Sequence, residues 1–256
     1  MTGPALLESM AAAQNGLGVL LGFAPSAVLL RRLDCAAALL PALQGQRPDI
    51  GHPGWAALID AVTVQETRLF RHPALLEAVA TEVLPALGAG GGTLRLVSAG
   101  CATGRKPSPW RCWHRGGIVG GGVGAGHLRP ALKAAATASW PQGPLDPARD
   151  VPDRYRAGLE AAGGRLRPGG PLRAAVRFQR ANLLDPPAGL LDGADLIMCR
   201  NVMIYLLPEA RAALLERFAT ALRPGGALVL GPTDSAAAEG GLVPWRPGLT
   251  SVWRRP

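Results

Sequence analysis

The sequence has few of the residues that build disulfide frameworks and metal sites. Only 4 of its 256 residues are cysteine, and they are scattered at Cys35, Cys101, Cys112 and Cys199. This arrangement has neither the spacing of a zinc site nor the density of a disulfide-stabilised small domain. The sequence therefore excludes a disulfide scaffold, and we expect no metal.

Long apolar runs and a leader segment are also missing. No stretch of about 18 uninterrupted apolar residues occurs, and the nearest candidate, residues 16–30, is broken by Pro25 and followed by Arg31 and Arg32. The N-terminus lacks the basic and then apolar layout of a signal peptide. We therefore expect a cytoplasmic protein with no membrane insertion.

Acidic residues are outnumbered, since 18 Asp and Glu face 27 Lys and Arg and give a formal charge of +9. Such a charge raises the question of nucleic-acid binding. The basic residues form no single stripe, however, and aromatic residues make up only 5% of the chain. We expect no nucleic acid as a partner, and an acidic protein partner fits the charge equally well.

The first third of the chain has a helical pattern. Leucines recur at helical spacing from Leu29 to Leu43, and the pattern continues after the breaker at residues 52–54. A further helix is predicted from Pro73 to Leu87, with proline in its first turn. The glycine-rich residues 88–93 resemble a linker.

Strand signals follow the linker. Buried strands are predicted at residues 94–99, 194–199 and 227–231, with a possible closing strand at 249–254, and a helix is predicted over 208–222. The first strand runs directly into a glycine-bounded turn, Gly100 to Gly104. Strand, glycine turn and helix in this order predict an α/β fold with a doubly wound, Rossmann-like sheet and a ligand at the carboxyl ends of its strands.

Three segments carry a more specific pattern. Asn182-Leu-Leu-Asp185 precedes Asp195-Leu-Ile-Met-Cys-Arg-Asn-Val-Met-Ile-Tyr205, which precedes Leu222-Arg-Pro-Gly-Gly226. Together with residues 63–71 and 97–104, they make the chain resemble the CheR family of chemoreceptor methyltransferases from about Asp60 to the C-terminus. The resemblance implies a class I S-adenosylmethionine (SAM) methyltransferase sheet over 94–256, preceded by a small all-helical domain over 1–87 and the linker 88–93. It also implies a small β-subdomain at about 150–178.

The resemblance assigns roles where residues match the family motifs. It implies that Arg71 and Thr67 hold the methionine end of SAM, with Gln65 in place of the family's usual asparagine. It implies backbone contacts to the cofactor from Ala99 and Gly100, and an adenine site beside Asn182 and Leu183. It places Arg200 and Tyr205 as the catalytic residues that face the substrate carboxylate. Taken singly, each residue has an ordinary alternative, because a buried arginine often pairs with a structural carboxylate and a tyrosine often packs in a core.

The implied reaction is esterification of glutamate side chains in the cytoplasmic helical region of chemoreceptors, by an enzyme that we expect to be a monomer. The nucleophilic carboxylate is already ionised at neutral pH, so the site must orient and desolvate it rather than deprotonate it. Two alternatives stay open. One is a class I methyltransferase for another acceptor, and the other is a methyltransferase-fold binding module that no longer binds SAM.

Residues 105–130 depart from the family. The family continues after Gly104 with two acidic residues, a helix and a strand that ends in Asp-Ile-Ser, whereas this segment contains Pro107, Pro109, a glycine run and no acid. Prolines and glycines oppose that helix and strand. Permitted codons for residues 104–113, with one base restored, encode Gly-Glu-Glu-Ala-Leu-Ala-Val-Ala-Leu-Leu. We therefore hypothesise that reading-frame errors produced the segment, that its five cations inflate the charge, and that SAM binding by the printed chain is weakened.

Overall fold

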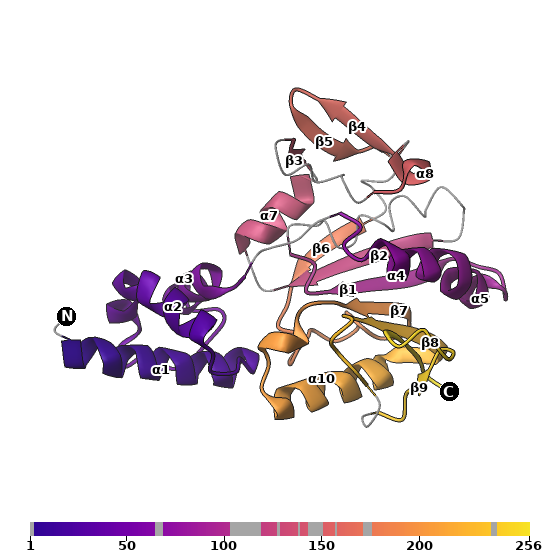
Figure 1. The fold of residues 1–256 in the computed structure, drawn as a ribbon. Helices are drawn as coiled ribbons and strands as arrows, with labels where there is room; N and C mark the ends of the chain where they lie inside the picture. The colour runs from indigo at the N-terminus through magenta and orange to yellow at the C-terminus, as the bar shows by residue number, and fades with distance from the viewer. Residues whose placement is uncertain are drawn as a thin grey trace.

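The computed structural model describes residues 3–64, 69–102, 119–126, 129–137, 139–142, 151–156, 158–170, 176–236 and 240–256. Its main feature is a seven-stranded sheet with the strand order β6-β2-β1-β7-β8-β10-β9 (Figure 1). The strands of this sheet are β1 (Leu94–Ala99), β2 (Val119–Gly126), β6 (Val176–Arg180), β7 (Ala194–Cys199), β8 (Leu222–Leu230), β9 (Val243–Pro244) and β10 (Val252–Arg254).

The five strands from β6 to β8 pair in parallel, and β10 joins β8 and β9 antiparallel. Strand order runs outward in both directions from β1, so the topological switch point lies between β1 and β7. This arrangement is that of a class I SAM-methyltransferase sheet, and it confirms the predicted fold class.

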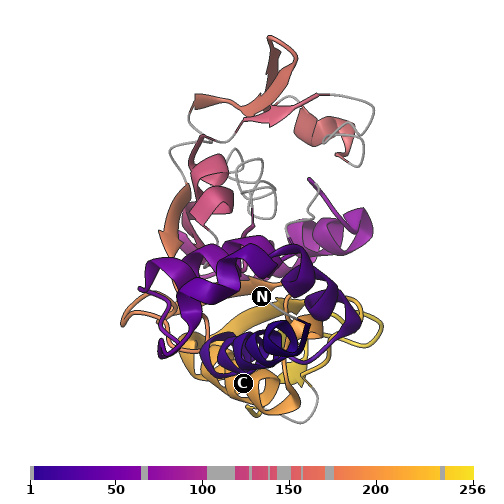
Figure 2. The same ribbon diagram turned by 90° about the vertical axis from the view of Figure 1, so that its left-hand side faces the viewer.

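Both faces of the central strands are buried, as a parallel sheet requires. Alternate residues of β1, Leu96 and Val97, enter different cores because successive side chains point to opposite faces. The core on one face contains the helical stretch 73–88, and the core on the other contains α10 (Pro208–Ala221). Helices thus cover the sheet on both sides (Figures 1 and 2).

The helix predicted over 73–87 is present but is not uniform. It begins as α4 (Pro73–Ala78), widens into a π-helical turn (Val79–Val83), and continues as α5 (Leu84–Gly88). The Leu84 N–H donates to the Val79 carbonyl, five residues back. Pro85 explains the wider turn, because it has no N–H and its ring crowds the carbonyl of the preceding turn.

The N-terminal helices form a separate core. They are α1 (Gly3–Leu21), α2 (Ala27–Cys35), the 3₁₀ segment Ala37–Leu43 and α3 (Pro53–Val62). Their buried residues, from Ala13 to Val62, pack on one another and on Ala131 of α7 (Arg129–Thr137). Helical residues before the linker therefore fall into two groups, 3–62 with its own core and 73–88 on the sheet. The predicted domain boundaries stay a prediction.

A second sheet of three antiparallel strands lies above the main sheet in Figure 1. It comprises β3 (Trp140–Pro141), β4 (Leu159–Ala162) and β5 (Arg165–Pro168), and α8 (Asp153–Arg156) precedes β4. We call residues 139–170 the small-sheet unit. It overlaps the β-subdomain expected at about 150–178, although residues 176–180 belong to the main sheet as β6.

One sequence expectation was wrong. The glycine run was expected to oppose a strand, yet residues 119–126 form β2, paired with β1 on one side and β6 on the other. Each glycine costs about 0.5–1 kcal/mol of backbone entropy, but β1 pairs with residues 119 and 121–125 of this strand and β6 pairs with residues 122–126. The residues before it, 103–118, lie outside the described part of the chain, so the proposed helix and the frame-shift hypothesis stay untested.

Candidate functional site

The candidate site lies where β1 and β7 end. Ala99 and Cys199 are paired across these two strands, so Gly100 and Arg200 leave the sheet side by side. Gly100 has φ of +69°, a conformation that glycine adopts without strain. The predicted residues Ala99, Gly100 and Arg200 therefore share one edge, at the switch point where doubly wound folds bind their ligands.

Backbone strain gathers around this edge. The non-glycine residues with positive φ among those described are Phe70 (51°), His72 (62°), Ala102 (49°) and Asn201 (55°). Two flank Arg71, one follows the β1 turn and one follows Arg200. Each such residue costs about 1–3 kcal/mol and persists only where its surroundings hold it, which is common at functional sites.

Arg200 and Arg71 meet at this edge. The Arg200 side chain is 3% exposed, and its Nη2 donates to the Arg71 carbonyl oxygen. Burial lowers the pKa of the Arg200 guanidinium to about 10, and the positive charge of Arg71 contributes in the same direction. Two nearby cations, one of them desolvated, favour an anion such as a carboxylate between them.

Asn201 is a site residue that the sequence analysis did not single out. Its Oδ1 is buried and accepts no hydrogen bond from the described residues. Because it follows Arg200 directly in the left-handed conformation, it sits in the turn that leaves β7. An asparagine just after a buried strand was the available signal, since asparagine tolerates that conformation better than most residues.

Asn182 and Leu183 lie just after β6, and their side chains make contacts within the protein. The Asn182 Nδ2 donates to the Leu20 carbonyl at 2.7 Å, and its Oδ1 accepts from the Leu184 N–H at 3.1 Å. The Leu183 side chain is 7% exposed and belongs to the α10-side core. Both side chains are thus engaged in contacts within the protein.

Tyr205 lies in a short 3₁₀ turn, Met203–Tyr205, against the N-terminal helices. It lines a small pocket of about 30 Å³ with residues from three segments of residues 3–64, which we call the helical unit. The pocket's other lining residues are Phe23, Ala24, Ser26, Val28, Leu29, Val62, Thr63 and Val64. The segment that leads to the predicted cofactor motif, residues 62–64, therefore faces Tyr205.

The helical unit is joined to this part of the site by backbone contacts. The Ala24 N–H donates to the Tyr205 carbonyl at 2.8 Å, and the Leu207 N–H donates to the Gly22 carbonyl at 2.7 Å. Gly22 has φ of +66°, and a Cβ there would lie 2.3 Å from the Cβ of Ala210. The helical unit is thus a close-fitted wall of the site.

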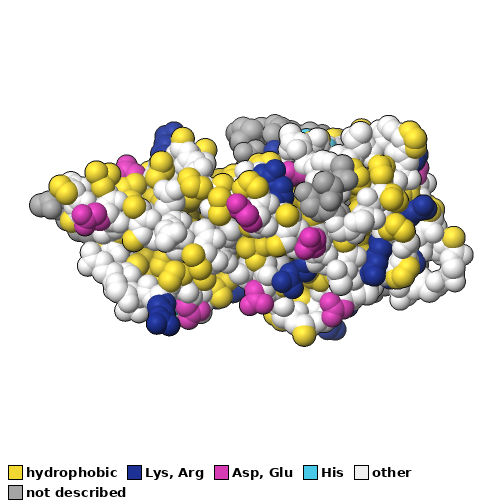
Figure 3. Space-filling model, turned by 90° about the horizontal axis from the view of Figure 1, so that it is seen from below, with side chains coloured by type: hydrophobic (Ala, Val, Ile, Leu, Met, Phe, Trp, Pro, Cys, Tyr) yellow, Lys and Arg dark blue, Asp and Glu magenta, His cyan; other side chains and the backbone are white. Residues whose placement is uncertain are grey.

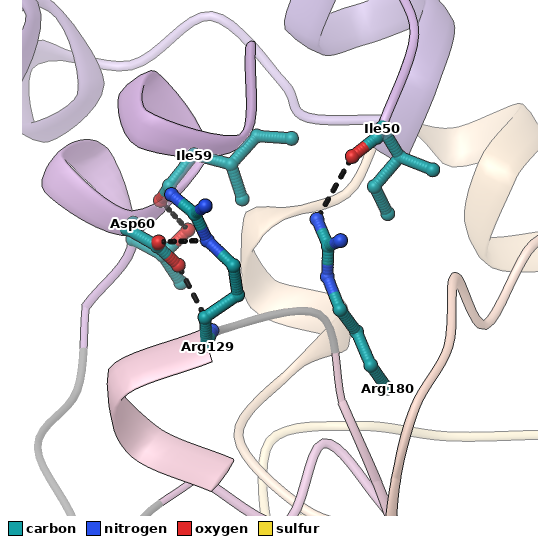
Figure 4. Close-up of polar contacts among 6 residues, drawn as sticks. Ile50, Ile59, Asp60, Arg129 and Arg180 are labelled. Atoms are coloured by element: carbon teal, nitrogen blue, oxygen red, sulfur yellow. Dashed lines mark hydrogen bonds and ion pairs between the residues drawn. The ribbon is translucent and has the colours of Figure 1, made fainter. Parts of the chain in front are cut away.

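A second set of contacts joins the helical unit to α7 and to the end of the edge strand β6 (Figure 4). The Arg129 backbone N–H and Nε donate to the two carboxylate oxygens of Asp60, at 3.0 and 2.8 Å. The Arg180 Nη2 donates to the Ile50 carbonyl at 2.8 Å. Contacts at both ends fix how the helices lie over the carboxyl edge.

Two of the predicted cofactor residues, Gln65 and Thr67, lie outside the described residues, as does Arg105. The structure thus brings together Arg71, Ala99, Gly100 and Arg200, places Tyr205 on the adjoining wall, and leaves the rest of the set untested. Among the described residues there is no cluster of three potential metal ligands. None of the helices that the structure describes is long and apolar enough to span a bilayer.

Comparisons with known proteins bear on the family to which the chain belongs. Residues 144–241 match the family described as CheR methyltransferase, SAM binding domain. Chemotaxis protein methyltransferase 1 of Pseudomonas aeruginosa is 33% identical over 190 residues, which cover 70% of this chain and 69% of that protein. The chemotaxis protein methyltransferase of Vibrio parahaemolyticus is 32% identical over 192 residues, covering 70% and 68%.

A longer relative also matches. The "Probable biofilm formation methyltransferase WspC" of Pseudomonas aeruginosa is 33% identical over 232 residues, which are 80% of this chain but 50% of that protein. The chain thus spans half the length of this relative. Among solved structures, geranyl diphosphate methyltransferase in complex with GPP and sinefungin aligns with 85% of this chain and 66% of its own, at 19% identity and a TM-score of 0.38. A likeness at that level supports no assignment of residues.

Proposed function

Because the chain belongs to the CheR methyltransferase family, we propose that it methylates glutamate side chains of chemoreceptors to form methyl esters. The observation that carries this proposal is the buried guanidinium of Arg200, just after β7, which donates to the backbone carbonyl of Arg71. A buried guanidinium whose pKa is lowered by desolvation, beside a second cation, suits a site that takes up carboxylates.

S-adenosylmethionine is the cofactor of this family domain, and when bound it supplies an electrophilic methyl group on sulfur. The residues at the carboxyl edge fit it in part. Gly100 has no side chain to keep a ligand from its backbone, Arg71 can pair with a carboxylate as a planar fork, and the buried Oδ1 of Asn201 can accept from a donor. The acidic residues that the family places after Gly104 are absent from the sequence.

The protein's own contribution is orientation. We assign the cofactor side to Gln65, Thr67, Arg71, Ala99, Gly100 and the backbone at Asn182 and Leu183. Arg200 holds the acceptor carboxylate by a charge-assisted hydrogen bond, and Tyr205 closes the wall beside it. The carboxylate needs no base, so these residues act by bringing two reactants into line and limiting their contact with water.

The acceptor is a glutamate on a helical segment of a chemoreceptor. The opening beside Tyr205 is bounded by α2, α3 and the 62–64 segment, so an incoming helix would lie against the helical unit. We propose that the reaction takes place in the cytoplasm and that the enzyme acts as a monomer.

A second function has a specific observation in its favour. In the printed sequence Arg105 stands where the family has an acid, and no acid occurs between residues 105 and 130. The loss of two charge-assisted contacts would weaken SAM binding by about 3–6 kcal/mol. On this reading the printed chain is a binding module on a methyltransferase fold.

Isothermal titration with SAM separates the two readings. The printed chain is compared with a chain in which residues 105–130 are replaced by the restored-frame sequence, with its Glu-Glu pair and Asp-Ile-Ser. We expect the restored chain to bind and to transfer methyl groups to a receptor fragment, and the printed chain to bind at least about 100-fold more weakly. Equal affinities would contradict the account of the segment, and a restored chain that binds but methylates no receptor would contradict the substrate.

A further inference from the structure

Tyr155 of the small-sheet unit touches the segment that carries Arg71. Its ring stacks on the Phe70 ring with centroids 5.0 Å apart and an interplanar angle of 26°. Tyr155 lies in α8, 84 residues further along the chain than Arg71, in a unit built on a different sheet. The small-sheet unit is therefore in contact with the residue next to a predicted cofactor-binding arginine.

The tyrosine ring is fixed on several sides. Its hydroxyl donates to Glu77 Oε1 of α4 at 3.2 Å. The neighbouring Arg154 forms an ion pair with the same carboxylate, and its guanidinium lies 5.1 Å from the Tyr155 ring centroid. A ring held by a stack, a hydrogen bond and a cation is a rigid support for whatever rests on it.

Phe70 needs such a support. It has φ of +51°, and His72 has φ of +62°, so Arg71 lies between two strained residues. A bulky residue with positive φ is strained and must be held by its surroundings. The Phe70 side chain is 2% exposed in the core that also takes in Leu76 and Val79, with Tyr155 packed against it.

The strained turn has a direct connection to the site. The Arg71 carbonyl accepts the hydrogen bond from buried Arg200. A change in the Phe70 backbone would turn the chain that follows it, including the Arg71–His72 peptide unit that carries this carbonyl. The conformation of Phe70 thus sets whether Arg71 and Arg200 are together.

We propose that Tyr155 is a positioning residue, which holds Phe70 in its strained conformation and thereby keeps Arg71 against Arg200. The small-sheet unit is then part of the site's scaffold. The inference rests on the proposed function only for what Arg71 binds, since the packing itself involves no cofactor.

Hydrogen exchange of the full chain without cofactor tests the proposal. In Tyr155→Ala we expect the amides of residues 70–72 to exchange at least about tenfold faster, with β1 and β7 unchanged. Tyr155→Phe keeps the stack and removes only the hydroxyl, so it should stay within about threefold of the parent. Arg165→Ala, in the same unit but bonded to Ser139, is the matched control and should leave residues 70–72 unaffected.

The outcomes separate positioning from ordinary packing. Unchanged exchange at residues 70–72 in Tyr155→Ala would overturn the proposal, and so would an equal acceleration throughout β1 and β7, because that indicates general loss of stability. If Tyr155→Ala does not fold, Tyr155→Leu, which keeps apolar volume without a ring, takes its place. A SAM titration of the restored-frame chain carrying the same variants then reports on Arg71's role, so that failure of the proposed function is seen separately.

Discussion

Arg200, which we propose holds the acceptor carboxylate, is a desolvated cation in the folded protein. Its charge is retained at neutral pH, because even the lowered pKa is about 10. Below that pH the folded state holds a desolvated cation that the unfolded chain would hold in water. Sites of this kind trade stability for activity.

Replacing this residue should therefore separate the two properties. In Arg200→Gln of the restored-frame chain, we expect methyl transfer to fall by about 10- to 100-fold or more, since a charge-assisted hydrogen bond to the carboxylate is lost. The midpoint of thermal unfolding should not decrease. Arg167→Gln, an exposed arginine of the small-sheet unit, serves as the control and should change neither quantity. A variant that melts earlier but keeps its activity would contradict the assignment.

Asp234 offers a test by pH. It follows β8, is 9% exposed, and has an Oδ2 that accepts no hydrogen bond from the described residues. Burial raises the pKa of its carboxyl group, against smaller lowering effects of the Gly231 backbone and Arg211. The folded state thus binds this proton more tightly than the unfolded state, so stability falls as pH rises through the two pKa values and stays lowered above them.

Asp234→Asn should remove the loss of stability that comes from a buried, ionised carboxylate. At pH 7 we expect the variant to melt higher than the parent by a few degrees, since about 1 kcal/mol moves the midpoint by about 2–4 °C in a domain of this size. The gap should narrow as the pH is lowered towards 4. Asp153→Asn, whose side chain is fully exposed, should show no such gain. A lower midpoint at pH 7 would mean that the carboxylate has a partner it depends on.

At the scale of elements, sequence and structure agree where side chains carry a pattern. The apolar runs at 94–99 and 194–199 predicted β1 and β7, and the helix over 208–222 was found at 208–221. β2 was missed because glycine has no side chain and so shows no alternation of apolar and polar residues. The sequence analysis counted these glycines only as unfavourable for a strand. The widened turn before Pro85 and the turn at Asn201 depend on backbone geometry, which periodicity does not report.

For the candidate site too, the sequence predicted the residues that lie in motifs and missed those that depend on three-dimensional contacts. Family motifs led to Arg71, Ala99, Gly100 and Arg200, which the fold brings to one edge. Tyr155 was beyond reach of the sequence, because its importance comes from a contact across 85 residues with Phe70. Contacts between distant segments leave no local signal.

Gly22 marks the junction between two elements, α1 and the 205–207 segment. Gly22→Ala should destabilise the protein by about 1–3 kcal/mol, because a methyl group would collide with Ala210 and the backbone conformation disfavours it. Gly45→Ala is a matched control, since Gly45 also has a positive φ (+72°) but nothing within 4 Å of the added carbon. Chemical denaturation of the two variants isolates the collision, and equal losses would contradict it.

At the scale of the whole molecule, charge is dispersed. Acidic and basic side chains are interspersed on the face seen in Figure 3. Ion pairs such as Arg246–Glu82 and Arg129–Asp60 commit some of the arginines to structural contacts. The net charge is therefore a poor guide to a polyanionic partner.

The helical unit and the main sheet should also respond differently when a contact of the helical unit is removed. Asp60→Ala removes the acceptor for both Arg129 donors seen in Figure 4. We expect faster hydrogen exchange in α1 to α3, with β1, β7 and β8 nearly unchanged, because the helical unit has its own core. Lys133→Ala, on the same helix as Arg129, is the control. Uniform acceleration in all elements would show that the two cores unfold together.

The glycine-rich strand has a consequence for how the chain can change over time. Opposite Leu94 and Arg95, β2 skips one residue, so that Val119 and Gly121 are the partners and Gly120 is left between them. A strand with so few side chains has little to keep it in one register. Lengthening or shortening the segment before it can therefore be absorbed by sliding along its neighbours, and the edge that carries Arg200 would not move. We therefore expect the main sheet to tolerate a change of length before β2 better than one before β7.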